Sequence, residues 1–204
     1  MPKERVTRGS GLLETFLARR RAEMANRLIP SISRTGCIAD IGCGRHPYFL
    51  LNTIFSRKIG LDKSIEEALT KSEQTPNITF IKHDVEQDPT LPIEDDSCDV
   101  VTMLAVIEHM EPNLVLPLLS AIRRILKPGG RLIVTVPAGW TDSLLRTMAR
   151  LKLVSPVEIE EHKATYTHKR LSEILKKFFS EDSVKLGYFE MHMNIWATAE
   201  KPQS

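Results

Sequence analysis

The sequence has 204 residues, of which 42% are hydrophobic, and a formal net charge of +2. A chain of this length and composition can bury one continuous core, so we expect a single globular domain spanning residues 1–204. The mild charge argues against a nucleic-acid partner, and the lack of a long apolar run argues against stable membrane insertion. The three cysteines lack metal-ligand spacing, which argues against a metal site and favours the cytoplasm.

A leading helix is expected over residues 10–29, where apolar residues recur at helical spacing before Pro30. It carries the basic run Arg19 to Arg21. Packing of this helix on the domain is favoured, and a lid over a ligand or contact with an anionic membrane surface remain alternatives.

Strands and helices then alternate along the chain. Strands are expected where short apolar runs occur, at 37–41, 58–62, 78–81, 98–105 and 131–136. Helices are expected between them, at 47–56, from Ser64 onward and at 112–126. This alternation predicts right-handed crossovers and a doubly wound, mostly parallel α/β sheet.

The pattern changes beyond Pro137. We expect a helix over 141–151, an irregular stretch to Thr167 and a helix over 169–179. Two strands at 184–189 and 194–199 are separated by only a few residues, which predicts a terminal antiparallel hairpin over 183–199.

Three aspartates mark the carboxyl ends of the first three strands. Asp40 precedes the turn glycines Gly42 and Gly44, and Asp62 and Asp84 follow at intervals of one strand-helix unit. Open α/β sheets bind ligands at this edge, and a carboxylate about twenty residues past the glycines can accept both hydroxyls of a ribose. Asp40 would crowd a pyrophosphate but suits a ligand with an ammonium and a sulfonium, such as S-adenosylmethionine.

The motifs together resemble those of class I S-adenosylmethionine-dependent methyltransferases. The resemblance rests on Asp40-Ile41-Gly42-Cys43-Gly44, Asp62, Asp84, the strand and turn at 99–109, and Leu126-Lys127-Pro128-Gly129-Gly130. The run from Ile107 to Pro112 is similar to the methyltransferase type 11 branch, which includes quinone-biosynthesis enzymes. The resemblance implies a Rossmann-like, seven-stranded sheet with an antiparallel last strand, a cofactor-binding core at 37–136 and a substrate-side segment at 138–168.

The resemblance also implies the residues that hold the cofactor. The methionine part is expected at Asp40, Gly42, Cys43 and Gly44, and the ribose at Asp62 and Lys63. The adenine is expected to face Asp84 and Val85, and Leu104 and Ala105 are expected beneath the methionine and sulfonium. Arg45-His46-Pro47 departs from the family pattern, where another glycine is often present, and leaves the loop shape open.

Methyl transfer is an in-line displacement, so the protein positions the nucleophile and, when needed, removes its proton. His109 is the favoured base because histidine titrates near neutrality, and Glu108 lies beside it. His162, Tyr166 and His168 lie in the segment expected to roof the site. Structural alternatives stay open: Glu108 as a helix cap, and the other three as residues that order the loop.

The expected acceptor is a small organic molecule with an oxygen, nitrogen or carbon nucleophile, and the product is S-adenosylhomocysteine. The fourth strand ends in Leu104 to Ile107, unlike the Asn/Asp-Pro-Pro-aromatic run of enzymes that methylate base nitrogens. Val136 to Gly139 offers no carboxylate for a catechol-type metal site.

A cofactor-binding protein without turnover, and methylation of a protein or lipid-linked acceptor, remain alternatives. A nicotinamide-dependent oxidoreductase is disfavoured by the missing third glycine. We expect a monomer or a homodimer.

Overall fold

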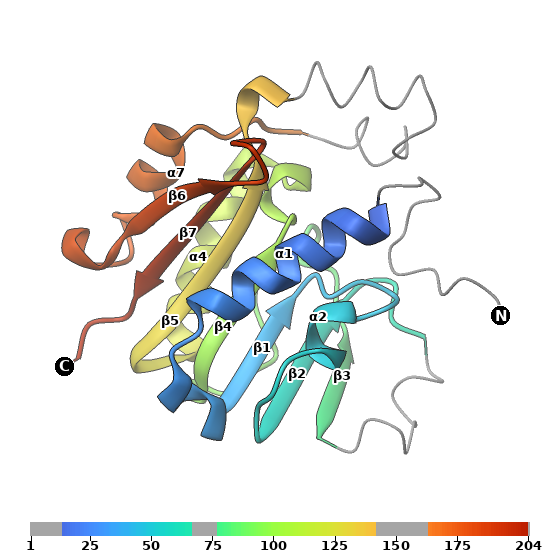
Figure 1. The fold of residues 1–204 in the computed structure, drawn as a ribbon. Coiled ribbons are helices and arrows are strands. Elements are labelled where there is room, and N and C mark those ends of the chain that lie inside the picture. Colours follow the sequence, from blue (N-terminus) through green and yellow to red (C-terminus); the bar gives the residue numbers. More distant parts are fainter. Residues whose placement is uncertain (1–13, 67–76, 142–162, 204) are drawn as a thin grey trace, which may run out of the picture.

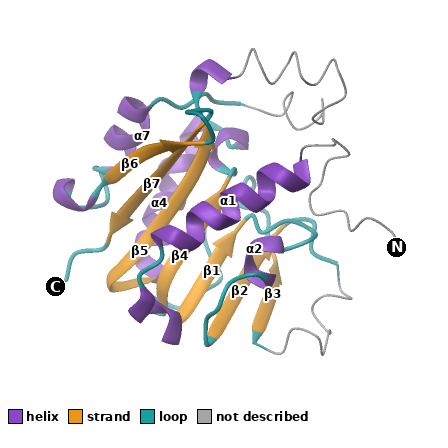
Figure 2. Cartoon of the chain, viewed as in Figure 1, coloured by secondary structure: helices purple, strands orange, loops and turns teal. Residues whose placement is uncertain are grey.

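A computed structural model describes residues 14–66, 77–141 and 163–203. The described residues form one seven-stranded sheet with the strand order β3-β2-β1-β4-β5-β7-β6 (Figure 1, Figure 2). The strands are β1 (Cys37–Ile41), β2 (Arg57–Asp62), β3 (Ile78–Lys82), β4 (Cys98–Leu104), β5 (Leu126–Pro137), β6 (Lys185–Phe189) and β7 (Asn194–Glu200). Strand β7 runs antiparallel to β5 and β6, and the other pairs are parallel. The expected α/β sheet with a reversed last strand is confirmed.

Helices cover both faces of the sheet (Figure 2). The α-helices are α1 (Glu14–Leu28), α2 (Tyr48–Leu51), α4 (Pro112–Ile125) and α7 (His168–Leu175). Short 3₁₀ helices are η1 (Ser31–Thr35), η2 (Ile107–His109), η3 (Gly139–Thr141) and η4 (Glu181–Ser183). Helices α1 and α2 cross one face, with α4 behind the sheet in Figure 1. Within the described ranges, no helix is both long and apolar enough to cross a membrane.

The core consists of two apolar layers, one on each side of the sheet. Ala39 and Ile41 of β1 pack with residues of α4 and α7, whereas Ile38 packs with Ala22 and Ala25 of α1. All five residues of β1 are buried because helices cover it on both sides, which explains why every residue but Asp40 is apolar. This central strand therefore holds its carboxyl end, and the residues that follow, in a fixed position.

Two elements differ from their predicted lengths. The helix expected over 47–56 is only α2, and the Lys58 ammonium donates to the Leu50 carbonyl at 2.8 Å, near the end of that short helix. Strand β5 starts at Leu126 rather than at 131, because Leu126 already pairs with Cys98 before a register shift brings Arg131 opposite Val100. Most of the helices expected from Ser64 onward and over 141–151 lie outside the described residues.

Candidate functional site

The loop after β1 brings backbone N–H groups to the carboxyl edge of the sheet. Gly42 and Gly44 adopt φ angles of 75° and 76°, a region that favours glycine. The N–H groups of Gly42 and Cys43 donate to the Leu61 carbonyl at 2.7 and 3.0 Å, which fixes the turn against β2. A Cβ at Gly42 would lie 2.6 Å from Val106 Cγ2, but one at Gly44 would have nothing within 4 Å. The open side of Gly44 is thus where a ligand can approach the backbone.

Asp62 connects this loop to the end of β2. The residue has 2% of its surface exposed, and its Oδ2 accepts a hydrogen bond from the Gly44 N–H at 2.9 Å. Its Oδ1 accepts from the Ser64 N–H at 2.8 Å and from the Ser64 hydroxyl at 2.5 Å. These bonds fix the orientation of the carboxylate, and a carboxylate has further acceptor capacity for ligand hydroxyls. The Ser64 hydroxyl donates to Asp62, and the helix that Ser64 was expected to cap lies mostly outside the described residues.

Asp40 is a buried carboxyl beside the glycine loop, with 3% of its surface exposed. The Thr102 hydroxyl on β4 donates to Asp40 Oδ1 at 2.6 Å. Burial raises the pKa of Asp40 to about 7; the Thr102 bond opposes this rise, and the negative charge of Asp62 adds to it. A cation at this position would replace part of the solvation that Asp40 has lost. The site therefore fits a ligand whose ammonium group lies next to the glycine loop.

Residues expected to face adenine form a hydrogen-bonded turn after β3. Asp84 Oδ1 accepts from the Glu86 N–H at 3.0 Å, and Val85 is buried in the core layer that contains α4. Lys63, which follows Asp62, forms an ion pair with Glu86 at 2.6 Å. The loops after β2 and β3 are therefore joined on the side where the ribose and adenine groups are expected.

The segment that resumes at residue 163 contacts these loops. The Lys163 ammonium lies 3.5 Å from Glu86 Oε2 and 3.3 Å from Glu111 Oε1. The N–H groups of Lys163 and Ala164 donate to the Glu108 carbonyl at 2.8 and 3.1 Å. This segment thus connects the turn after β3 to the turn after β4.

Strand β4 ends at Leu104, and Ala105 follows with a φ angle of 60°. Its N–H donates to the Thr135 carbonyl on β5 at 2.9 Å, which holds this left-handed residue in place. Non-glycine residues in this region are strained and occur often at functional sites. The strain lies at the position expected beneath the methionine and sulfonium.

The catalytic candidates do not share one environment. Helix η2 contains Glu108, with 2% of its surface exposed, and His109, which is only partly buried. The N-cap of α4 is Glu111, so Glu108 does not occupy the capping position considered for it. Among the pair, His109 is therefore the more accessible base.

Tyr166 has 1% of its surface exposed and lies next to η2. Its hydroxyl donates to the Ile107 carbonyl at 3.3 Å, and burial raises its pKa to about 12. These features favour a supporting role beneath η2 over proton transfer. His168 stacks on Tyr188 with ring centroids 4.0 Å apart, and His162 lies outside the described residues.

Sequence reasoning missed the contacts that orient the aspartates. Thr102 is a polar residue between the apolar residues Val101 and Met103 of β4, a signal that it bonds to a neighbouring strand. Cys43, expected at the cofactor, contributes its backbone to the turn, while its side chain packs against the core layer under α1. No sequence signal indicated that Lys163 would reach Glu86 and Glu111.

Comparison with known proteins gives a family match over the same region. Residues 39–134 match the family model described as "Methyltransferase domain". The chain is 31% identical over 135 residues to "Probable methyltransferase ltbC" of Aspergillus luteorubrus, covering 59% of this chain and 47% of that protein. It is 26% identical over 122 residues to "tRNA N(3)-cytidine methyltransferase METTL2" of Mus musculus, covering 55% of this chain and 31% of that protein. The chain thus spans less than half the length of these curated relatives.

Solved structures share the fold. A S-adenosylmethionine-dependent methyltransferase from Mesorhizobium loti has a TM-score of 0.66 at 18% identity, over 90% of this chain and 99% of that one. Phosphoethanolamine N-methyltransferase 2 of Haemonchus contortus, in complex with S-adenosylhomocysteine, has a TM-score of 0.63 at 16% identity, over 91% and 53% of the two chains. Residues 39–134 are therefore similar to methyltransferase domains, and the strand order agrees with the fold that these solved structures share.

Proposed function

We propose that this chain is an S-adenosylmethionine-dependent methyltransferase that acts on a small organic acceptor. The observation that carries the proposal is the buried carboxyl of Asp40, with its pKa raised to about 7, beside the open backbone at Gly44. A buried carboxyl is costly unless a ligand or a proton compensates it. An ammonium group next to a glycine loop provides that compensation, and the match to the methyltransferase family model supports S-adenosylmethionine as its source.

Different residues would bind different parts of the cofactor. Asp40 would pair with the ammonium group, and the backbone at Gly42 and Gly44 would contact the methionine part. Asp62 would accept the ribose hydroxyls from an orientation already fixed by the Gly44 N–H. S-adenosylmethionine, when bound, supplies an electrophilic methyl group.

The remaining cofactor contacts would come from the next loops of the same edge. Lys63 would stand beside the ribose, and Asp84 and Val85 would face the adenine. Leu104 and the strained Ala105 would lie beneath the methionine and sulfonium. The parallel pairing of β1, β2, β3 and β4 supports this arrangement, because it brings their carboxyl ends to one edge.

The chain's contribution to the reaction would be to orient the acceptor and, for an acidic nucleophile, to accept its proton at His109. Partial burial of His109 on η2, directly after the β4 edge, supports this role. Glu108 and Tyr166, which are almost fully buried, would hold η2 in position. We further propose that the chain works in the cytoplasm, where its three cysteines would remain reduced.

A labelling experiment tests the reaction and the acceptor class together. The purified chain is incubated with S-adenosylmethionine carrying a radiolabelled methyl group and a host-cell extract, which is then separated into small molecules, lipids, protein and RNA. Asp62→Ala is the control for background, because it removes the expected ribose contact. Label in the small-molecule fraction supports the proposal.

Label in another fraction would change the conclusion. If the RNA fraction were labelled, RNA would replace a small molecule as the proposed acceptor. RNA is the acceptor type in the name of the Mus musculus relative. Label in protein or lipid would favour the corresponding macromolecular acceptor. Cofactor binding by calorimetry with no labelled fraction would contradict turnover.

A further inference from the structure

Two cysteines lie at the edge of the sheet opposite to the glycine loop. Cys37 is the first residue of β1 and Cys98 is the first residue of β4, and these strands pair in parallel with Ile38 opposite Val100. Both side chains belong to the same core layer, on the α4 face of the sheet. The two sulfur atoms therefore come from neighbouring strand ends and lie on one face.

Polar contacts connect the two strand ends. The Cys37 N–H donates to Asp99 Oδ2 at 2.8 Å, next to Cys98. The Arg57 guanidinium donates to the Cys37 sulfur at 3.2 Å and to the Ser97 carbonyl at 3.4 Å. The Ser97 hydroxyl lies 3.7 Å from the Cys98 sulfur. One thiol thus contacts a cation, and the other contacts a hydroxyl.

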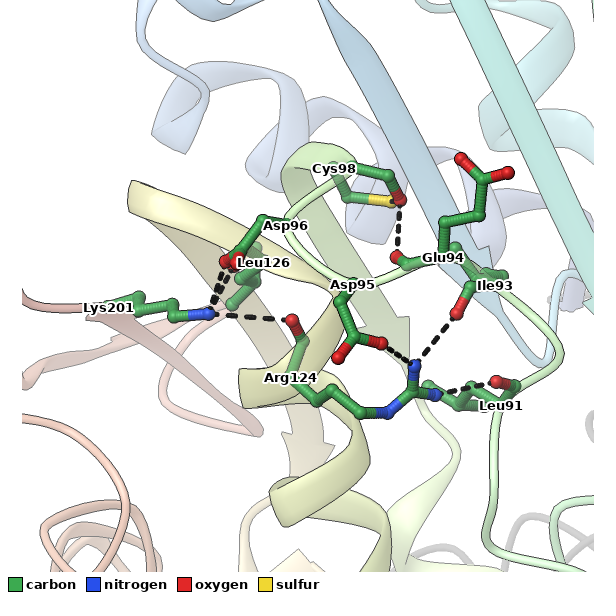
Figure 3. A network of polar contacts seen from close by, with 10 residues as sticks. Leu91, Ile93, Glu94, Asp95, Asp96, Cys98, Arg124, Leu126 and Lys201 are labelled. Carbon is green, nitrogen blue, oxygen red and sulfur yellow. Dashed lines mark hydrogen bonds and ion pairs between the residues drawn. The ribbon is translucent and has the colours of Figure 1, made fainter.

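The loop before Cys98 is anchored, as Figure 3 shows. Arg124 of α4 donates to the Leu91 carbonyl at 2.7 Å and to the Ile93 carbonyl at 3.0 Å. Lys201 pairs with Asp96 at 2.6 Å. These bonds limit movement of the chain that leads into Cys98.

The two thiols have opposite ionisation behaviour. Interactions with the Cys98 thiol and with the Arg57 guanidinium together lower the pKa of Cys37 to about 6, although burial and the negative charge of Asp99 oppose them. Interaction with Cys37 and burial raise the pKa of Cys98. A thiolate beside a protonated thiol is the arrangement in which one sulfur is the nucleophile and the other resolves the product.

We propose that Cys37 and Cys98 form a peroxide-reactive dithiol, a disulfide-forming modification site at the amino-terminal edge of the sheet. The Cys37 thiolate attacks one oxygen of the peroxide, the O–O bond breaks, and the departing hydroxide takes a proton to become water. The Cys98 sulfur then attacks the Cys37 sulfenic acid, forming the S–S bond and releasing the second water with the Cys98 proton. Two thiols and one hydrogen peroxide become one disulfide and two waters.

The proposal does not depend on methyl transfer, and Cys43 provides an internal comparison. Cys43 lies in the glycine loop, and it is less buried than Cys37 or Cys98. Reactivity set by exposure alone would therefore favour Cys43, whereas reactivity set by the Arg57 contact favours Cys37. The order in which the cysteines react distinguishes these two cases.

The test uses the reduced, full-length chain treated with a slight excess of hydrogen peroxide, alkylation of remaining thiols and peptide mass spectrometry. We expect a Cys37–Cys98 cross-link while Cys43 is recovered alkylated. In Cys98→Ser the reaction should stop at a Cys37 sulfenic acid, which dimedone labels. Arg57→Gln should slow the reaction about tenfold near neutral pH, because it removes the cation that favours the thiolate.

Two controls keep the test decisive. Arg123→Gln removes an exposed arginine on α4 and should leave the rate unchanged. Cys98→Ala replaces Cys98→Ser if circular dichroism shows that the serine variant does not fold. Preferential oxidation of Cys43, recovery of Cys37 and Cys98 as free thiols, or an unchanged rate in Arg57→Gln would overturn the proposal.

Discussion

Replacing Asp40 with asparagine should stabilise the fold at alkaline pH while weakening cofactor binding. The substitution keeps the side-chain shape and an oxygen that can accept the Thr102 hydrogen bond, but it removes the buried charge. The pKa of Asp40 rises from 3.8 to about 7 in the folded chain, so the folded state binds the proton more tightly than the unfolded state. Stability from this group is therefore present at acid pH and is lost as pH rises towards 7.

The size of the effect follows from that shift. Each pKa unit corresponds to about 1.4 kcal/mol, so ionised Asp40 costs the fold up to about 4 kcal/mol above neutral pH. The loss begins as pH rises above 3.8, where the carboxyl of the unfolded chain ionises, so at about pH 5 wild type has lost only about 2 kcal/mol of it. At about pH 8 the variant should be the more stable protein by a few kcal/mol.

Denaturant unfolding followed by circular dichroism at both pH values measures this difference. Asp182→Asn is a matched control, because Asp182 is an exposed carboxylate on η4. A stability difference between wild type and Asp40→Asn that is the same at both pH values would refute the reasoning. So would a variant that is less stable than wild type at alkaline pH.

Four further predictions follow from the same edge of the sheet. Affinity for S-adenosylhomocysteine, measured by calorimetry, should fall about tenfold per pH unit below neutrality in wild type, since protonated Asp40 cannot pair with an ammonium. The affinity of Asp40→Asn should vary little with pH. Equal pH profiles of affinity in the two proteins would exclude the contact between Asp40 and the ammonium. Gly42→Ala should lower the free energy of unfolding by about 1–3 kcal/mol, because its φ is positive and the added Cβ would meet Val106; a loss no larger than that of Gly44→Ala, where the space is open, would argue against this close approach. His109→Gln should reduce the methyl-transfer rate by about tenfold or more with little change in cofactor affinity; a variant with wild-type rate and affinity would show that His109 is not the base. Lys163→Gln should speed dissociation of the cofactor, measured by stopped flow. The rate constant should respond less to salt than in wild type, because the ion pair between Lys163 and Glu86 is partly exposed. An unchanged rate constant would show that this ion pair does not help to retain the cofactor.

The fold followed from local patterns because alternating strands and helices leave few possible topologies. The short, largely apolar runs at β1 and β4 were informative, since strands covered on both faces have that composition. The ends of the strands and helices were harder to predict from the sequence. Strand β5 begins at Leu126 because Leu126 pairs with Cys98 of β4, a tertiary contact that local turn propensity does not include.

The candidate site was predicted in outline through the three aspartates and the glycine turn. What the sequence could not give is burial and pairing. Glu108 follows a strand as a loop residue would, yet η2 and the segment at Lys163 enclose it. Tyr166 resembles a residue of a site roof, but its hydroxyl bonds to the Ile107 carbonyl in the interior. Both outcomes depend on packing between segments distant in sequence.

The most direct test of the proposed function is calorimetric titration of the purified chain with S-adenosylmethionine, beside Asp62→Ala and the exposed control Glu94→Ala. Wild type and the control should bind one equivalent with matching affinity. Asp62→Ala should bind at least about tenfold more weakly while its circular dichroism spectrum stays unchanged, because it loses the carboxylate assigned to the ribose. No binding by wild type, or equal affinity in folded Asp62→Ala, would contradict the assignment of this edge as the cofactor site.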